Sequence, residues 1–305
     1  MSESSRDHWR ERSRIWARTA PRGRAEDDSF NQMIIAEAAI RPGEAVLDVA
    51  SGTGNPAVSI ALALDGRGSV TCGDLEPAML EAARGRAANL SLSVMRFAAA
   101  DMTRLPFRDG TFDCVICRFG IMFPGDRVAA AREALRVLRP DGRAAYLVWG
   151  AYADNPPFHV PRRTVAAFFG EDEGPVPARH SMSAPGTLAA MLDAAGFARA
   201  EERELRYRNR VEDPRDYVVR GLRRTFAKKI ETLAPERIAA LERALLAAWD
   251  PYKARCCRCP TVPASASAGN RHERRAPDVK GMSRARPCPN DCTLQAGTPV
   301  GRRER

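Results

Sequence analysis

Short apolar runs alternate with segments of helical spacing over the first 250 residues of the chain. Ala45–Val49 is such a run, of the kind found in the middle of a parallel sheet. It leads into 56–64, which reads as a helix with proline in its first turn. Further strands are expected at 70–74, 94–101, 112–118 and 143–149. This alternation predicts an α/β fold, here a three-layer Rossmann-like sandwich with a mostly parallel sheet.

The segments around this core have compositions of their own. Residues 1–40 are expected to form an N-terminal helical cap that includes a charged helix at 5–24. Residues 150–185 are rich in proline, glycine and aromatic side chains and are predicted to be a lid insertion. Within the lid, Asn155–Phe158 is predicted to be a rigid loop, because its two prolines disfavour helix and strand. The remaining expected elements are helices at 28–40, 184–196, 214–230 and 235–249 and a sixth strand at 197–211.

A glycine turn comes directly after the first strand and carries the first chemical signal. The sequence from Val46 to Asn55 reads Val-Leu-Asp-Val-Ala-Ser-Gly-Thr-Gly-Asn. Gly52 and Gly54 permit a tight turn and a close approach of the backbone to a ligand, at which the first N–H groups of the next helix point. Such a turn also serves dinucleotides, or serves no ligand at all. Its meaning therefore depends on the residues in the strands after it.

Acidic residues lie in or directly after three of the predicted strands: Asp48, Asp74 and Asp101. Each taken singly is compatible with a helix cap or a solvated loop. Together they line the sheet edge where open α/β folds bind ligands. A carboxylate after the second strand accepts hydrogen bonds from ribose hydroxyls, which favours an adenosine-bearing ligand.

These residues resemble the class I S-adenosylmethionine-dependent methyltransferases. The glycine turn resembles the cofactor loop of that family, with Ala50 where the first glycine usually stands. Leu135–Gly142 resembles the turn before its fifth strand, and the segment 118–123 is similar to the small-molecule branch that includes the ubiquinone and menaquinone C-methyltransferases. The resemblance implies S-adenosylmethionine as cofactor, a small-molecule acceptor, Asp74 at the ribose and Asp101 with Met102 at the adenine. The implied cofactor-binding residues are Asp48, Ala50, Gly52, Gly54, Asp74, Leu75, Asp101, Met102 and Arg118.

Other functions remain open on the sequence alone. An NAD(P)-binding oxidoreductase shares the first strand, turn and helix, but the loop lacks the third glycine that permits close packing around a pyrophosphate. A non-catalytic scaffold or remnant that only binds S-adenosylmethionine is the other alternative. Asn155-Pro-Pro-Phe is similar to a motif of amino-group methyltransferases that act on nucleic acid, but it comes after the fifth strand and not the fourth. Nucleic acid is therefore not the expected acceptor.

Methyl transfer from a sulfonium needs no metal and no obligatory catalytic side chain, because positioning supplies most of the rate. If the acceptor needs a base, His159 in the lid is the candidate, and a structural role for this histidine is the alternative. The first 250 residues contain no cluster with metal-ligand spacing, and no run of 18 apolar residues occurs. The charged amino terminus does not resemble a secretory signal. A cytoplasmic protein without a membrane segment is expected.

Residues 254–305 differ sharply from the rest. They contain no Phe, Tyr, Trp or Ile, yet hold five of the eight cysteines. Eleven Lys/Arg against four Asp/Glu give them a charge of +7, most of the net charge of +10 of the whole chain. A basic, proline-rich segment without large apolar residues does not offset its ordering entropy. The methyltransferase domain is therefore predicted to cover 1–253, and 254–305 to be disordered.

Three interpretations of this tail are open. Its arginines fit a nucleic-acid-binding arm, although no aromatic residues lie between them. Cys256, Cys257 and Cys259 fit part of a thiol metal site. The chain holds 44 Arg against 4 Lys, which indicates GC-rich coding DNA, and such DNA read out of frame yields Arg, Pro, Ala, Ser and Cys; we favour this origin. Class I methyltransferases place a seventh, antiparallel strand between the fifth and sixth, and the lack of a strand-like run after Tyr252 predicts that it is missing.

Overall fold

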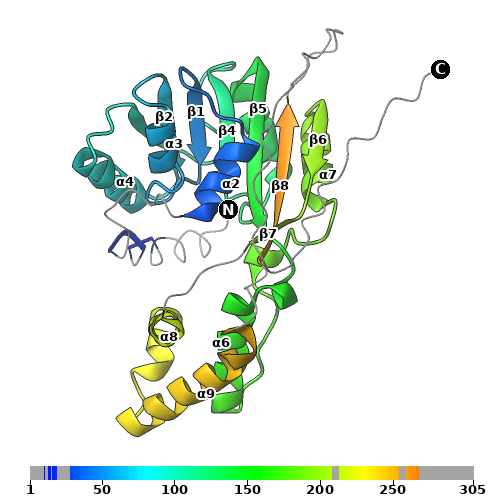
Figure 1. Ribbon diagram of the computed structural model, residues 1–305. Coiled ribbons are helices and arrows are strands. Elements are labelled where there is room, and N and C mark those ends of the chain that lie inside the picture. Colours follow the sequence, from blue (N-terminus) through cyan, green and yellow to red (C-terminus); the bar gives the residue numbers. More distant parts are fainter. Residues whose placement is uncertain are drawn as a thin grey trace, which may run out of the picture. The chain divides into compact units, whose positions relative to one another are not determined.

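The structure, a computed structural model, describes residues 28–207, 213–253 and 259–267, together with residues 10, 13–14 and 16–18. All of them belong to one compact unit, Met1–Asn270. Its centre is a sheet of order β3-β2-β1-β4-β5-β8-β6 (Figure 1), and β7 pairs with β8 beside this path. The strands are β1 (Ala45–Val49), β2 (Ser69–Asp74), β3 (Met95–Ala99), β4 (Phe112–Arg118), β5 (Leu138–Trp149), β6 (Arg199–Glu202), β7 (Leu205–Tyr207) and β8 (Cys259–Ser267). The first five strands pair in parallel, and β8 runs antiparallel to β5 and β6.

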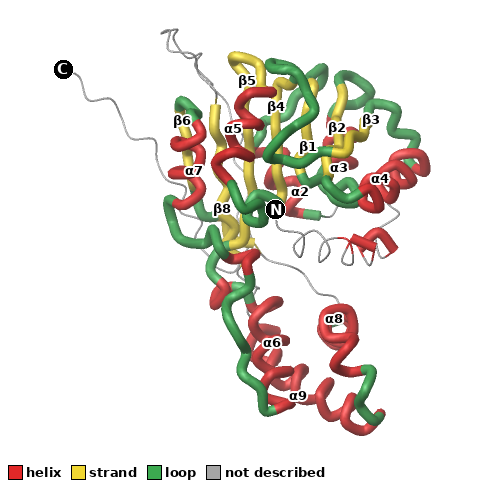
Figure 2. The backbone as a smooth tube through the Cα atoms, turned by 180° about the vertical axis from the view of Figure 1, so that it is seen from behind, coloured by secondary structure: helices red, strands yellow, loops and turns green. Residues whose placement is uncertain are grey.

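Helices cover both faces of this sheet. The helices on these faces are α2 (Ser29–Glu37), α3 (Ala57–Ala63), α4 (Pro77–Asn89), α5 (Arg127–Val137) and α7 (Thr187–Ala195). The structure also contains α6 (Pro156–Phe169), α8 (Pro214–Ile230) and α9 (Pro235–Lys253), with short 3-10 helices η1 (Tyr152–Asp154) and η2 (Ala178–His180). Successive strand residues enter opposite cores: Val46 packs with α2 and α3, and Leu47 packs with α5 and α7. Figure 1 shows α2 in front of the sheet, and Figure 2 shows α7 on the other face. The predicted three-layer Rossmann-like sandwich is confirmed.

Most predicted elements form close to their expected bounds because their end signals are local. Asp28 caps α2, since its Oδ1 accepts hydrogen bonds from the backbone N–H groups of Phe30 (3.1 Å) and Asn31 (3.3 Å). Gly196 ends α7 in the left-handed conformation, at a φ of 99°. The fifth strand is longer than expected, because β5 begins at Leu138, directly after α5. The expected sixth strand is divided into β6 and β7, and residues 208–211 of its range, like most of the helix at 5–24, lie outside the described residues.

The prediction of a rigid loop at Asn155–Phe158 is wrong. Pro156 and Pro157 occupy the first turn of α6, and the helix continues to Phe169. Backbone N–H groups in the first turn have no hydrogen-bond acceptor within the helix, so proline loses nothing there. The prolines therefore mark the start of this helix. Gly170, at a φ of 67°, ends it.

The prediction that the seventh strand is missing is also wrong. Residues 259–267, in the segment expected to be disordered, form β8 between β5 and β6. Its register pairs Leu147 with Pro263 and Ala200 with Ala266. A central strand with prolines is unusual, because proline donates no hydrogen bond to the ladder. The segment pairs through its backbone with the free edges of β5 and β6. Its weakly apolar sequence does not predict this pairing. Residues 254–258 and 268–305 lie outside the described residues, so the frame-shifted origin stays a prediction.

Helices α6, α8 and α9 share a third core of their own. Val165 from α6, Leu222 from α8 and Leu245 from α9 are among its buried members. The two predicted helices after the sixth strand are confirmed, and α9 extends to Lys253. No helix among the described residues is both long and apolar enough to cross a membrane.

Candidate functional site

The glycine turn after β1 adopts backbone conformations that explain its composition. Gly52 and Gly54 have φ values of 55° and 89°, in the region that glycine adopts without strain. Ala50 also lies there, at a φ of 56°. Its Cβ fits because Gly120, after β4, faces it: a Cβ added at Gly120 would lie only 2.5 Å from that of Ala50. The alanine that replaces the usual first glycine therefore depends on a glycine elsewhere in the chain.

Asp74 ends β2 and holds this turn in place. Its Oδ2 accepts a hydrogen bond from the backbone N–H of Gly52 at 2.8 Å, and its Oδ1 accepts one from Glu76 at 2.9 Å. Burial raises the pKa of its carboxyl group, and the two backbone donors oppose that rise. The structure thus brings together two residues predicted from separate motifs, and Leu75 lies next to Asp74, half-buried.

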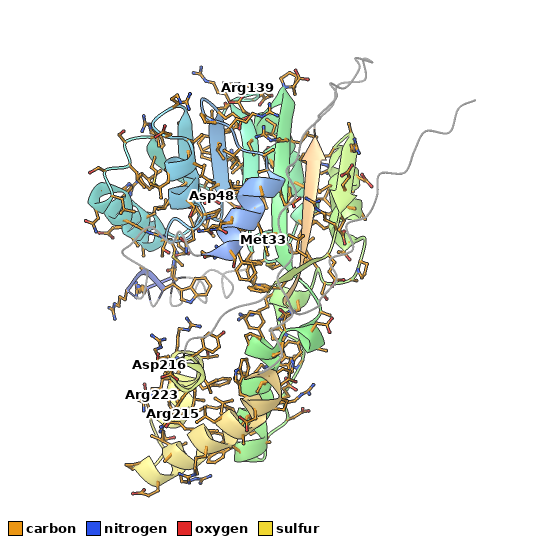
Figure 3. All side chains as sticks on the ribbon, in the orientation of Figure 1. Met33, Asp48, Arg139, Arg215, Asp216 and Arg223 are labelled. Atoms are coloured by element: carbon orange, nitrogen blue, oxygen red, sulfur yellow. The ribbon has the colours of Figure 1, made fainter. Side chains whose placement is uncertain are left out.

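Asp48 is the most unusual group at this edge of the sheet. It lies in β1 (Figure 3), its exposed fraction is 0%, and neither carboxylate oxygen has a hydrogen-bond partner among the described residues. Burial raises the pKa of Asp48 to about 8, although the charge of Arg118 and the nearby backbone N–H of Ala57, which falls short of hydrogen-bond geometry, act in the opposite direction. A buried acid without a partner destabilises the fold. Such a group points to a ligand that supplies the partner.

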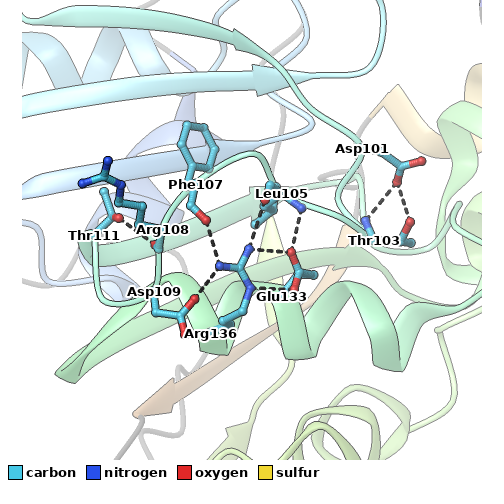
Figure 4. A network of polar contacts seen from close by, with 9 residues as sticks. All are labelled: Asp101, Thr103, Leu105, Phe107, Arg108, Asp109, Thr111, Glu133 and Arg136. Carbon is cyan, nitrogen blue, oxygen red and sulfur yellow. Dashed lines mark hydrogen bonds and ion pairs between the residues drawn. The ribbon is translucent and has the colours of Figure 1, made fainter.

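Asp101 and Met102 open the loop after β3. Asp101 Oδ1 accepts hydrogen bonds from the backbone N–H (2.9 Å) and the hydroxyl (2.7 Å) of Thr103 (Figure 4). Further along the loop, Arg136 of α5 donates to the carbonyl oxygens of Leu105 (3.0 Å) and Phe107 (2.8 Å). Both guanidinium edges of Arg136 are also paired, with Asp109 and with Glu133. Helix α5 therefore fastens the loop that carries the predicted adenine-binding pair.

Comparison with known proteins agrees with this geometry. Residues 46–142 match the family model described as "Methyltransferase domain", which spans every predicted cofactor residue. The chain carries a class I S-adenosylmethionine-dependent methyltransferase domain. It is 41% identical over 117 residues to an uncharacterized protein of Mycobacterium tuberculosis strain H37Rv, which covers 38% of this chain and 41% of that protein. It is 35% identical over 114 residues to the ubiquinone/menaquinone biosynthesis C-methyltransferase UbiE of Marinomonas sp., covering 37% of this chain and 45% of the relative.

The aligned region thus spans less than half the length of these curated relatives. A solved structure, the YcgJ protein from Bacillus subtilis, superposes with a TM-score of 0.51 at 21% identity, over 79% of this chain and 99% of that one. This likeness shows the fold alone.

Arg118 is the last residue of β4 and connects this strand to helix α2. Its Nη1 contacts Asp28 Oδ2 at 2.7 Å and Asn31 Oδ1, so it fastens the first turn of α2 to the end of β4. Its side chain is only 15% exposed. The effect of Arg118 on the site is electrostatic, because its charge lowers the pKa of Asp48. A direct contact of Arg118 with the cofactor stays a prediction.

An aromatic cluster lies at the same edge of the sheet and was not predicted from the sequence. Phe119 stacks on Trp149, with ring centroids 4.0 Å apart and an angle of 4° between the planes. Phe30 meets both rings edge-on, and Phe158 of α6 lies 4.8 Å from Trp149. The signal that could have found it is positional: Phe119 comes directly after β4 and Trp149 ends the neighbouring parallel strand β5, at the ligand-binding edge of the sheet.

His159, the base candidate of the sequence, lies inside α6. It is 4% exposed, and its ring faces Tyr152 and Tyr252, both at 5.9 Å between centroids. Neither ring nitrogen has a hydrogen-bond partner among the described residues, and burial lowers its pKa. A second buried histidine, His180 of η2, contacts the aromatic cluster at Phe158, with 5.2 Å between the two ring centroids. No group of three His, Cys, Asp or Glu in the described ranges is arranged to hold a metal ion.

Proposed function

We propose that this protein transfers a methyl group from S-adenosylmethionine to a small-molecule acceptor. The observation that carries the proposal is the carboxylate of Asp48, which is fully buried, lacks a partner among the described residues, and lies on the strand that leads into the glycine turn. The cofactor has an α-ammonium group that would pair with this carboxylate. NAD has no such group, and its pyrophosphate would be repelled by the acid.

The remaining residues fit the other parts of the cofactor. Asp74 already accepts backbone hydrogen bonds, but a carboxylate has about four acceptor positions, so ribose hydroxyls can still donate to it. Asp101 and Met102 would contact the adenine, in a loop that α5 holds. When bound, S-adenosylmethionine supplies an electrophilic methyl group on a sulfonium. The protein would contribute position and the exclusion of water, since an in-line displacement needs little else.

Titration calorimetry with S-adenosylhomocysteine and, separately, with NAD tests this proposal on the full chain. We expect micromolar binding of the first and none of the second. Asp48→Asn should weaken binding by about tenfold or more, because it removes a charge-assisted pair. Asp193→Asn is the matched control, since Asp193 is an exposed residue of α7. Tight binding of NAD, or equal S-adenosylhomocysteine affinity for both variants, would contradict the proposal.

A further inference from the structure

The geometry around His180 determines which of its nitrogens carries the proton. Its Nδ1 lies 2.8 Å from the carbonyl oxygen of Gly150. A carbonyl oxygen only accepts, so Nδ1 must be the N–H donor and the neutral ring keeps its lone pair on Nε2. This Nε2 has no hydrogen-bond partner among the described residues, and His180 is 3% exposed. The result is an oriented imidazole with a buried, unused acceptor nitrogen.

His180 is also anchored to the sheet. The next residue, Ser181, accepts a hydrogen bond at 2.7 Å from Arg127, which at the same time donates to the carbonyl oxygen of Met122 at 3.0 Å. Met182 is buried in the core between the sheet, α5 and α7. These contacts tie η2 to the segments after β4 and β5. A base must be held still relative to the reacting atoms, and this anchoring provides that.

His159 differs in this respect. It lies in α6, and the next residue, Val160, belongs to the core shared by α6, α8 and α9. Its ring makes aromatic contacts, and the nearby backbone of Ala153 acts to raise its pKa. Neither of its nitrogens, however, lies in hydrogen-bond geometry with a described residue, as Nδ1 of His180 does with the Gly150 carbonyl. The tautomer and orientation of His159 are therefore not determined in the way that those of His180 are.

The surroundings of His180 suit a planar aromatic ligand. The rings of Tyr152 and Phe158 each lie 5.2 Å from the imidazole, between centroids. Phe158 in turn contacts Trp149, which stacks on Phe119 at the ends of β5 and β4. A series of ring contacts thus connects the sheet edge with the imidazole of His180. Aromatic rings attract other rings through offset and edge-on contacts.

We propose that His180 is the general base for an acceptor that carries a hydroxyl group on an aromatic ring, an inference that rests on the proposed methyl transfer. The hydroxyl oxygen forms a bond to the methyl carbon, and the methyl–sulfur bond breaks with its electron pair going to sulfur. The hydroxyl proton passes to Nε2. The resulting imidazolium keeps its Nδ1 hydrogen bond to Gly150.

The charge state of His180 agrees with this role. Burial lowers its pKa, so the ring is neutral and able to accept a proton near pH 7. The charged and titratable groups around it are Arg179, whose guanidinium lies 4.7 Å from the Phe158 ring, the Tyr152 hydroxyl, which donates to Glu173, and His159 across the Tyr152 ring. The positive charge of Arg179 also lowers the pKa of His180.

The test uses 4-nitrophenol as a probe, added to the full chain saturated with S-adenosylhomocysteine at a pH below the pKa of the free probe, so that a phenolate absorption band reports bound probe; calorimetry measures its affinity. His180→Asn keeps an N–H donor for the Gly150 carbonyl but removes the base. We expect it to bind S-adenosylhomocysteine normally, to bind the probe about tenfold more weakly, and to lose the phenolate band. His159→Asn is the matched control and should leave the band in place.

Two results would overturn the assignment of His180. One is that wild-type protein binds S-adenosylhomocysteine but not the probe. The other is that His180→Asn and wild-type protein bind the probe equally and with the same spectrum. Loss of the band in His159→Asn alone would transfer the role to His159. Failure of wild-type protein to bind S-adenosylhomocysteine would instead refute the proposed function, so the two failures are distinguishable.

Discussion

Replacing Asp48 by Asn should make the ligand-free protein more stable above about pH 5, because the charge at this position opposes folding. The pKa of Asp48 rises from 3.8 to about 8 on folding. For an acid shifted in this direction, the folded state favours the protonated form, so stability is greatest below the unfolded pKa and is lost as pH rises toward 8. At pH 7 the difference amounts to about three pKa units, or about 4 kcal/mol as an upper bound. Asn is neutral at every pH and resembles the protonated acid in shape.

Urea denaturation between about pH 5 and pH 8 measures this effect. The stability difference between Asp48→Asn and wild type should grow by up to about 1.4 kcal/mol per pH unit and level off near pH 8. The exposed Asp193→Asn control should show no such trend. If Asp48→Asn is less stable than wild type at pH 7, or if the two pH profiles run parallel, burial of this carboxylate does not destabilise the fold. Gain of stability with loss of cofactor affinity would mark it as a functional residue.

Three further predictions concern the parts that support the site. Arg136→Met should lower the free energy of unfolding by about 2 kcal/mol and weaken S-adenosylhomocysteine binding, because it removes five hydrogen bonds to the loop and to α5. Arg132→Met, on the same helix, is the control and should change neither quantity. Urea unfolding measures the stability of both variants, and calorimetry measures their binding. Gly120→Ala should destabilise the fold by about 2 kcal/mol or more through its clash with Ala50, and Ala50→Gly should restore part of that loss in a double-mutant cycle. A chain that ends before β8 should unfold without cooperativity or aggregate, whereas one that ends at Asn270 should unfold like the full chain.

The core of the site was predictable because its signals are local in sequence. The glycine turn follows β1, and Asp74 ends the neighbouring parallel strand β2. Parallel strands bring their carboxyl ends together at one edge of the sheet, so Asp74 contacts Gly52. The burial of Asp48 is implied by its place inside an apolar strand. The compensation of Ala50 by Gly120 was not predictable, since it depends on how closely two loops approach.

The elements that sequence reasoning missed are those decided by long-range partners. β8 has no apolar pattern of its own, and its place is set by the open edges of β5 and β6. The prolines at the start of α6 favour a loop when taken alone, but they fit a first helical turn once Val160 and Val165 pack against α9. His180 is distinguished from His159 by the carbonyl of Gly150 beside it and by the anchoring of η2 through Ser181, and the fold creates both contacts.

A crystal structure of the full chain with S-adenosylhomocysteine would test the proposed cofactor site directly. We expect the ligand to lie along the carboxyl edge of β1 and β2, with its amino group facing Asp48, its ribose at Asp74 and its adenine beside Met102. A ligand bound at any other place, or one whose amino group lies away from Asp48, would contradict it.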